Sequence, residues 1–241
     1  MNGVWTTILF TIISFLPVLL LGYYIYKKDS VKEPKTLLTK LVLCGLIASL
    51  LVIILDIVLT IVYPNLHVSN YSTDFSPYLL FILIFLEVGL LEESMKWFMI
   101  RIVGYDNPEF DQIYDIIVYC VFIAIGFAFF ENLFYVLQGG LQAAVLRGLL
   151  AVPAHAVYGV FMGYFLGKAK LSKNKSSLIK YIFLSIFVPA VMHTIYDYIL
   201  MFNSSYSFYI LIGYMLILYV TAYKIVEKLS GIKKPFRKKE L

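Results

Sequence analysis

Long apolar stretches alternate with short polar segments along the whole chain of 241 residues. A helix rises about 1.5 Å per residue, so each stretch is long enough to cross roughly 30 Å of hydrocarbon. The pattern predicts an all-α, polytopic transmembrane helix bundle of about seven helices, because only helices and closed barrels satisfy their backbone groups in lipid. The predicted helices lie near residues 3–26, 41–63, 78–100, 113–137, 141–167, 178–201 and 207–225.

Composition agrees with this pattern. Hydrophobic residues make up 61% of the chain, charged residues only 15%, and the mean hydropathy is +0.85. These values exclude an ordinary soluble domain and leave no room for a separate soluble catalytic domain. We expect a single transmembrane domain over residues 1–241, with a basic cytoplasmic tail over residues 226–241.

The basic residues predict the orientation. Alternating the loops between two sides places 19 of the 20 Lys and Arg residues on one side, including Lys96 and Arg101, and leaves Arg147 within the fifth helix. The positive-inside rule then gives an outside N-terminus and a cytoplasmic C-terminus. The basic cluster 233–239 suits anionic lipid headgroups better than nucleic acid, and His67, in an outer loop, is expected to be a plain surface histidine.

Several ionisable residues lie inside the apolar stretches. Each costs about 2.5–3.5 kcal/mol to insert at mid-membrane, so a purely structural bundle would rarely keep them. They occur in four fragments: Glu92-Glu93-x-x-Lys96, Phe127-x-x-x-Glu131-Asn132, the segment with Arg147 and His155, and His193-x-x-x-Asp197.

Helical spacing suggests how the fragments are arranged. Glu92 and Lys96 are four residues apart and can neutralise each other, which leaves Glu93, about 100° away on the helix, without a partner. Asp197 is likewise four residues from His193, so it can orient the imidazole of His193, or both side chains can point at one ligand. An interhelical hydrogen bond is the structural alternative for each fragment taken alone.

Counting charges favours a functional site. Four carboxylates face only two cations, Lys96 and Arg147, so the carboxylates share protons, a cation is bound, or a histidine is protonated. Arg147 can clamp a carboxylate or a substrate carbonyl, and His155 is either a site residue or a satisfied interhelical histidine. We expect Glu92, Glu131 and His193 to converge on one water-accessible cavity, with Glu92 within roughly 20 Å of His193.

Taken in order, these fragments resemble the PrsW family of intramembrane proteases, relatives of the CAAX prenyl proteases and bacteriocin-immunity proteins. The resemblance covers most of the chain and rests on an ordered set of motifs: Lys32-Glu33-Pro34, Glu92-Glu93-x-x-Lys96, Gly126-Phe127-x-x-x-Glu131-Asn132, the His155 segment and His193-x-x-x-Asp197.

The resemblance implies a glutamic-type protease of the bacterial cell membrane. Its expected substrate is a single-pass anti-sigma factor, cut first in a cascade that releases a sigma factor for a stress response. Glu92 would activate water and Glu93 would support it, while His193 would act as an acid or oxyanion stabiliser. The expected catalytic residues are Glu92, Glu93, Glu131 and His193, and the expected supporting residues are Lys96, Asn132, Arg147, His155 and Asp197.

Three alternatives remain open at the level of sequence. No cofactor is expected, but Glu92, Glu131 and His193 are acceptable zinc ligands, although the chain has no His-Glu-x-x-His motif. A proton- or cation-coupled transporter also needs intramembrane carboxylates. A non-catalytic helper could bind a partner helix through the small-residue stripe formed by Gly159, Gly163 and Gly167.

Overall fold

The structure of the chain is a computed structural model, and it describes residues 3–64, 76–202 and 204–232. His67 and the basic cluster 233–239 lie outside these ranges. The described residues form helices joined by turns, with no strand among them. The elements are α1 (Gly3–Lys28), α2 (Lys35–Val62), α3 (Pro77–Ile84), η2 (Phe85–Leu90), α4 (Leu91–Val103), α5 (Asp115–Leu146), η3 (Arg147–Ala151), α6 (Val152–Lys170), α7 (Lys175–Met201) and α8 (Ser207–Ser230).

The all-α membrane architecture is confirmed. Five described helical stretches are long and apolar enough to cross a membrane, and the one from Asp115 to Lys170 contains two of the predicted helices. The predicted third helix is divided into α3, the π-helical turn η2 and α4. The last helix, α8, continues to Ser230, past the predicted end at residue 225. The count of seven spans stays a prediction.

The stretch from Asp115 to Lys170 reverses direction at Gly140. This glycine has φ of +58°, which side chains with a Cβ rarely adopt. On either side of it the two arms pack antiparallel: a Cβ at Gly159 would lie 2.9 Å from the carbonyl oxygen of Cys120, and one at Gly163 would lie 2.6 Å from Cα of Ile117. The predicted glycine stripe therefore packs α6 against α5, and the helper interpretation is wrong because the chain itself covers the stripe.

A second close crossing joins α2 to α5. A Cβ at Gly126 would fall inside contact distance of the carbonyl oxygen of Val42, and a Cβ at Gly45 would do the same with the carbonyl oxygen of Ile123. Small residues at such crossings let backbones approach closely, which drives helix packing where lipid weakens the hydrophobic effect. Gly126 precedes Phe127 and Glu131 on α5, so this crossing fixes the helix that carries them.

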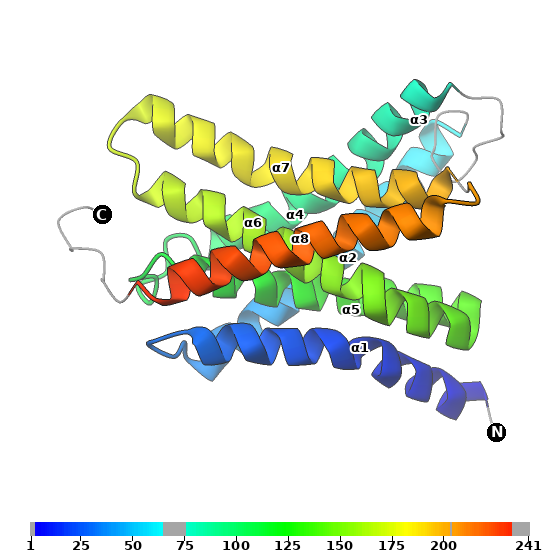
Figure 1. Cartoon of the computed structure of the whole chain (residues 1–241), viewed down its shortest axis with the longest axis horizontal. Helices are drawn as coiled ribbons and strands as arrows, with labels where there is room; N and C mark the ends of the chain where they lie inside the picture. The colour runs from blue at the N-terminus through cyan, green and yellow to red at the C-terminus, as the bar shows by residue number, and fades with distance from the viewer. Residues whose placement is uncertain (1–2, 65–75, 203, 233–241) are drawn as a thin grey trace.

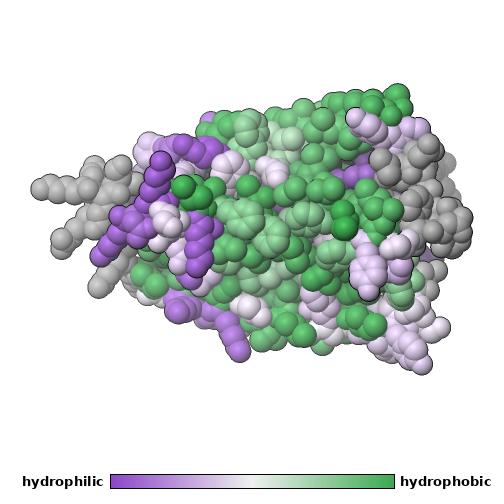
Figure 2. All heavy atoms as spheres, turned by 90° about the horizontal axis from the view of Figure 1, so that it is seen from above, coloured by the Kyte–Doolittle hydropathy of each residue, from purple (hydrophilic) through white to green (hydrophobic). Residues whose placement is uncertain are grey.

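The bundle has an apolar middle and a polar end. Side chains around its waist are mostly hydrophobic, and hydrophilic residues gather at the end where α8 finishes (Figure 2). The α1–α2 and α6–α7 turns lie at that same end, whereas α1 begins at the opposite end (Figure 1). Many large apolar side chains are exposed, among them Leu20, Ile57, Ile61 and Ile217. This distribution fits a helix bundle surrounded by lipid.

Candidate active site

The intramembrane ionisable residues meet inside the bundle. They come from α4, α5, η3, α6 and α7, and α6 is buried along most of its length. The two π-helical turns flank them, since η2 ends immediately before α4 and η3 begins with Arg147. Such turns often occur at functional sites.

Lys96 joins the α4 carboxylates to α6. Its ammonium lies 2.7 Å from Glu93 Oε1, 3.4 Å from Glu92 Oε2 and 3.0 Å from His155 Nδ1. The ammonium also lies 4.0 Å from the centre of the Phe127 ring, a cation–π contact. Lys96 contacts Glu92 as expected, but the expectation that Glu93 has no partner is wrong, because Glu93 is the closer of the two glutamates.

His193 lies between carboxylates on both sides of its ring. Nδ1 is 3.3 Å from Glu93 Oε1 and 3.7 Å from Glu92 Oε2, and Nε2 is 3.2 Å from Asp197 Oδ2. The expected pairing of His193 with Asp197 is therefore present. If His193 is protonated, each ring nitrogen directs an N–H toward a carboxylate. A protonated histidine is one of the three ways, named above, in which the excess of carboxylates can be balanced.

Glu131 forms the second half of the site. Its Oε1 accepts from Arg147 Nη2 at 2.8 Å, and its Oε2 lies 2.8 Å from His155 Nε2. The Nε of Arg147 donates to Asn132 Oδ1 at 3.1 Å. Arg147 thus clamps two side chains of α5, and the carbonyl of the Asn132 side chain faces this arginine.

His155 connects the two halves. Its Nδ1 faces the Lys96 ammonium and its Nε2 faces Oε2 of Glu131, so a neutral ring with its hydrogen on Nε2 suits the charges of both neighbours. The ring is buried and meets the His193 ring edge-on at 5.1 Å between centroids. Of the two roles that the sequence allowed for His155, the structure therefore places it in the candidate site.

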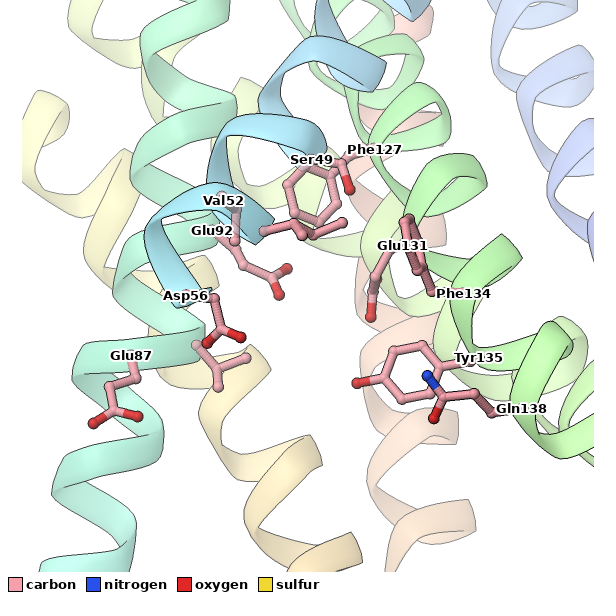
Figure 3. Close-up of a pocket in the computed structure, with 12 residues that line it drawn as sticks. Ser49, Val52, Asp56, Glu87, Glu92, Phe127, Glu131, Phe134, Tyr135 and Gln138 are labelled. Atoms are coloured by element: carbon pink, nitrogen blue, oxygen red, sulfur yellow. The ribbon is translucent and has the colours of Figure 1, made fainter. Parts of the chain in front are cut away.

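Glu92 and Glu131 face one cavity from opposite walls (Figure 3). This cavity has a volume of about 350 Å³ and lies between α2, η2, α4 and α5. Asp56 and Glu87 also line it. A smaller hollow of about 20 Å³, enough for a single water, lies behind it. Its polar lining consists of Glu131, Arg147, His155, Tyr158, His193, Tyr196 and Asp197.

Glu92 and Glu93 differ in access. Glu93 is fully buried and is absent from the lining of the cavity, whereas Glu92 lines it and is 8% exposed. Glu92 is also farther than Glu93 from both Lys96 and His193. Glu92 can therefore reach a molecule in the cavity, and Glu93 can act only through its neighbours.

Two tyrosines belong to the site although the sequence did not single them out. The ring of Tyr158 stacks on His193 at 5.1 Å between centroids, and Arg147 lies 3.8 Å from the centre of the Tyr135 ring. Tyr158 follows His155 by three residues and Tyr135 follows Glu131 by four, so each shares a helix face with a site residue. The helical spacing from His155 and Glu131 is therefore a sequence signal that could have indicated both tyrosines.

The donor types also fit a metal ion. Glu92, Glu93, His155 and His193 each offer one ligand atom, and these atoms lie within 4.8 Å of one another. Carboxylate oxygen and imidazole nitrogen are ordinary zinc ligands. The zinc ligands considered from the sequence were Glu92, Glu131 and His193. In the structure Glu93 and His155 belong to the cluster of possible ligands, and Glu131 does not. The Lys96 ammonium contacts three of these four residues, so a divalent ion among them would be repelled unless the ammonium moved or lost its proton.

Comparison with known proteins identifies the family of the chain. Residues 33–223 match the family model described as PrsW family intramembrane metalloprotease. The chain is 36% identical to "Protease PrsW" of Oceanobacillus iheyensis, over 86% of this chain and 89% of the relative. It is 32% identical to "Protease PrsW" of Geobacillus kaustophilus, over 90% of each chain. "Protease PrsW" of Bacillus subtilis is 44% identical over 54% of this chain and 60% of the relative.

No solved structure matches the chain. The family match covers more than half of the chain and includes every residue of the candidate site. Together with two relatives above 30% identity over most of their length, it settles the family. The chain belongs to the PrsW family of intramembrane proteases and is a membrane-embedded peptidase.

Proposed function

We propose that the chain is a glutamic-type endopeptidase of the bacterial cell membrane that makes the first cut in a single-pass anti-sigma factor. The observation that supports this best is the pair of carboxylates, Glu92 and Glu131, on opposite walls of one cavity (Figure 3). Lys96 contacts Glu92, and His155 and Arg147 contact Glu131. A water between two such carboxylates can be oriented by one and deprotonated by the other.

Glu92 is proposed as the general base because it reaches the cavity and its contacts to Lys96 and His193 are long. Water gives a proton to Glu92 while its oxygen bonds to the carbonyl carbon of the peptide. The C–N bond then breaks, and the proton passes from Glu92 to the nitrogen of the leaving amine. Glu131, fixed by Arg147 and His155, orients the water.

The developing oxyanion needs donors close by. Arg147 and His193 both line the small hollow next to Glu131, so we propose that the carbonyl oxygen turns toward them. Asn132 is a weaker candidate because its side-chain oxygen is bonded to Arg147 and the residue is buried. Glu93, Lys96 and Asp197 are positioning residues in this proposal, since they contact His193, Glu92 or His155.

A metal-dependent peptidase is the second candidate, supported by the family description and by the four clustered donors. Glu92, Glu93, His155 and His193 would hold the ion. A bound zinc would supply an activated water and polarise the peptide carbonyl. In that case Lys96 would have to give up its contacts to the ligands, which distinguishes the two candidates structurally.

The proposed substrate enters as a membrane-spanning segment with its cut site near the cavity. We propose seven spans, with the N-terminus outside and the C-terminus in the cytoplasm, on the basis of the distribution of Lys and Arg. Membership in a protease family disfavours the transporter interpretation that the sequence left open.

The direct test is co-expression with single-pass anti-sigma factors from the same genome, followed by immunoblotting. Wild-type chain should produce a membrane-proximal fragment, and Glu92→Gln should produce none while accumulating in the membrane at the same level. Cleavage by both proteins would show that Glu92 is not the general base. Cleavage by neither, with both in the membrane, would contradict the proposed substrate class.

A further inference from the structure

A second group of buried carboxylates lies at the polar end of the bundle. Asp29 lies in the α1–α2 turn, Glu33 directly precedes Pro34 and α2, and Asp115 is the first residue of α5. One ligand-type oxygen from each lies within 4.8 Å of the other two, and all three residues are buried. Asp115 precedes Glu131 by 16 residues, or about 24 Å along a helix, so the group is separate from the candidate active site.

Most of these carboxylate oxygens have no hydrogen bond of normal geometry. Both side-chain oxygens of Asp29, Oε2 of Glu33 and Oδ1 of Asp115 are buried without one among the described residues. The other oxygen of Asp115 accepts from the amides of Asp111 and Gln112 at 2.9 and 2.6 Å. Buried oxygens of this kind are costly unless something in the folded protein binds them.

Tyr119 provides an independent observation. It is fully buried, and its hydroxyl has no hydrogen-bond partner of normal geometry within the described ranges. The hydroxyl faces Glu33, with Asp115 also near. Tyr119 therefore directs a fourth buried oxygen toward the three carboxylates, from the same helix, α5, that begins with Asp115.

The charge around the group is unbalanced. Lys32 is the cation beside Asp29, and its ammonium donates to the backbone carbonyls of residues 26, 27 and 29 at 2.5–2.8 Å. Asp111 and Glu109 add negative charge nearby. The three buried carboxylates alone exceed the charge of Lys32 by two, and a single divalent ion would balance that excess.

We propose that Asp29, Glu33, Asp115 and Tyr119 bind a hard divalent cation of the Mg²⁺ or Ca²⁺ type. All four ligands are oxygen atoms, as these ions prefer, and no nitrogen or sulfur is present to favour zinc. The ion would join the α1–α2 turn to the start of α5. Direct contacts already join the same segments: Ser30 donates to Gln112 at 2.8 Å, and Tyr114 donates to the carbonyl oxygen of Ile25 at 3.0 Å.

The ion would stabilise the helix that carries Glu131. Burial, together with the charge of Asp115, raises the pKa of the Glu33 carboxyl to about 8. Protonation of the carboxylates is therefore the alternative to cation binding as a way to reduce the buried negative charge. The two solutions differ in one measurable respect, because only a cation site responds to divalent ions at constant pH.

The test uses the purified full chain in detergent, stripped with EDTA and then titrated with Mg²⁺ or Ca²⁺ at constant pH and ionic strength. A site filled at 100 times Kd should raise Tm by about 5 °C. The double variant Asp29→Asn/Glu33→Gln should lose that response. Glu92→Gln should keep it, which separates this group from the metal-binding alternative at the candidate active site.

The quantity to compare between the wild type and the variants is the rise in Tm on adding the ion, because removing buried charge can change Tm by itself. No response in the wild type, or an equal response in the double variant, would overturn the proposal. Tyr119→Phe is a milder variant in case the double variant does not fold, and it should weaken Mn²⁺ binding in equilibrium dialysis. An unchanged Mn²⁺ affinity in Tyr119→Phe would exclude the hydroxyl as a ligand and count against the proposal.

Discussion

The ammonium of Lys96 lies 2.7 Å from Oε1 of Glu93, three residues earlier on α4, and both side chains are buried. This pair leaves Glu92 at the longer distance of 3.4 Å from the same ammonium. The two neighbouring glutamates therefore have different surroundings. Glu93 is a fixed counter-charge inside the bundle, and Glu92 faces the cavity.

Replacing Lys96 with Met should destabilise the protein by about 3 kcal/mol, because Glu93 would lose its closest cation in a buried setting. It should also reduce cleavage, since His155 loses a donor at Nδ1. Thermal unfolding in detergent and the cleavage rate would be measured together. Lys40→Met, at an exposed position on α2, is the control and should change stability by less than about 0.5 kcal/mol. Equal stability of the two variants would contradict the role of the Lys96–Glu93 pair.

Arg147→Lys should lower kcat/KM by roughly tenfold or more while leaving the protein folded. The guanidinium contacts Glu131 through Nη2 and Asn132 through Nε, and a single ammonium cannot reproduce that fork. Kinetics of purified protein in proteoliposomes would measure the loss. A lysine variant with wild-type kcat/KM would show that charge alone is sufficient at this position.

Gly126→Ala should destabilise the bundle by about 2 kcal/mol or more, because the new Cβ meets the carbonyl oxygen of Val42 on α2, which is backbone and cannot rotate away. Gly213→Ala on α8 is the matched control, since a Cβ there meets nothing within 4 Å. The control should be neutral or slightly stabilising through helix propensity. Similar Tm values for the two variants would argue against the close α2–α5 crossing.

Removal of metal ions separates the two proposed chemistries. If Glu92 activates water without a metal, protein treated with a zinc chelator and verified by elemental analysis should cleave at the untreated rate. If Glu92, Glu93, His155 and His193 hold zinc, activity should fall with zinc content and return on adding zinc back. Divalent ions of the Mg²⁺ type would be kept constant, so that the carboxylate group around Asp29 is not perturbed.

Much of the architecture could be predicted from the sequence because hydrophobic length alone limits where helices cross a membrane. The reversal at Gly140 falls between two predicted helices, and the glycine stripe on α6 packs closely as expected. The third helix was predicted as continuous, and its π-helical turn was missed, because residues 85–90 contain no proline and their one glycine, Gly89, is a residue also common in regular transmembrane helices.

The candidate site could be predicted only in part. Spacing within one helix correctly suggested that His193 and Asp197 are adjacent, because helical neighbours are set by local geometry. The same reasoning correctly paired Lys96 with Glu92, but it left Glu93 without a partner, which is wrong, because a side chain three residues away on a helix is also within reach of Lys96. The bridging position of His155 depends on three helices and could not be predicted from any one of them.

The cleavage rate of purified Glu92→Gln in proteoliposomes, compared with that of Glu87→Gln, tests whether Glu92 is the general base. Both glutamates line the same cavity, so the pair differs in chemical role rather than in location. We predict that Glu92→Gln loses at least about 99% of the wild-type rate, as general-base catalysis is typically worth 10²–10⁴-fold, and that Glu87→Gln keeps most of it. Substantial cleavage by Glu92→Gln, with protein confirmed as folded, would contradict the assignment of Glu92 as the base.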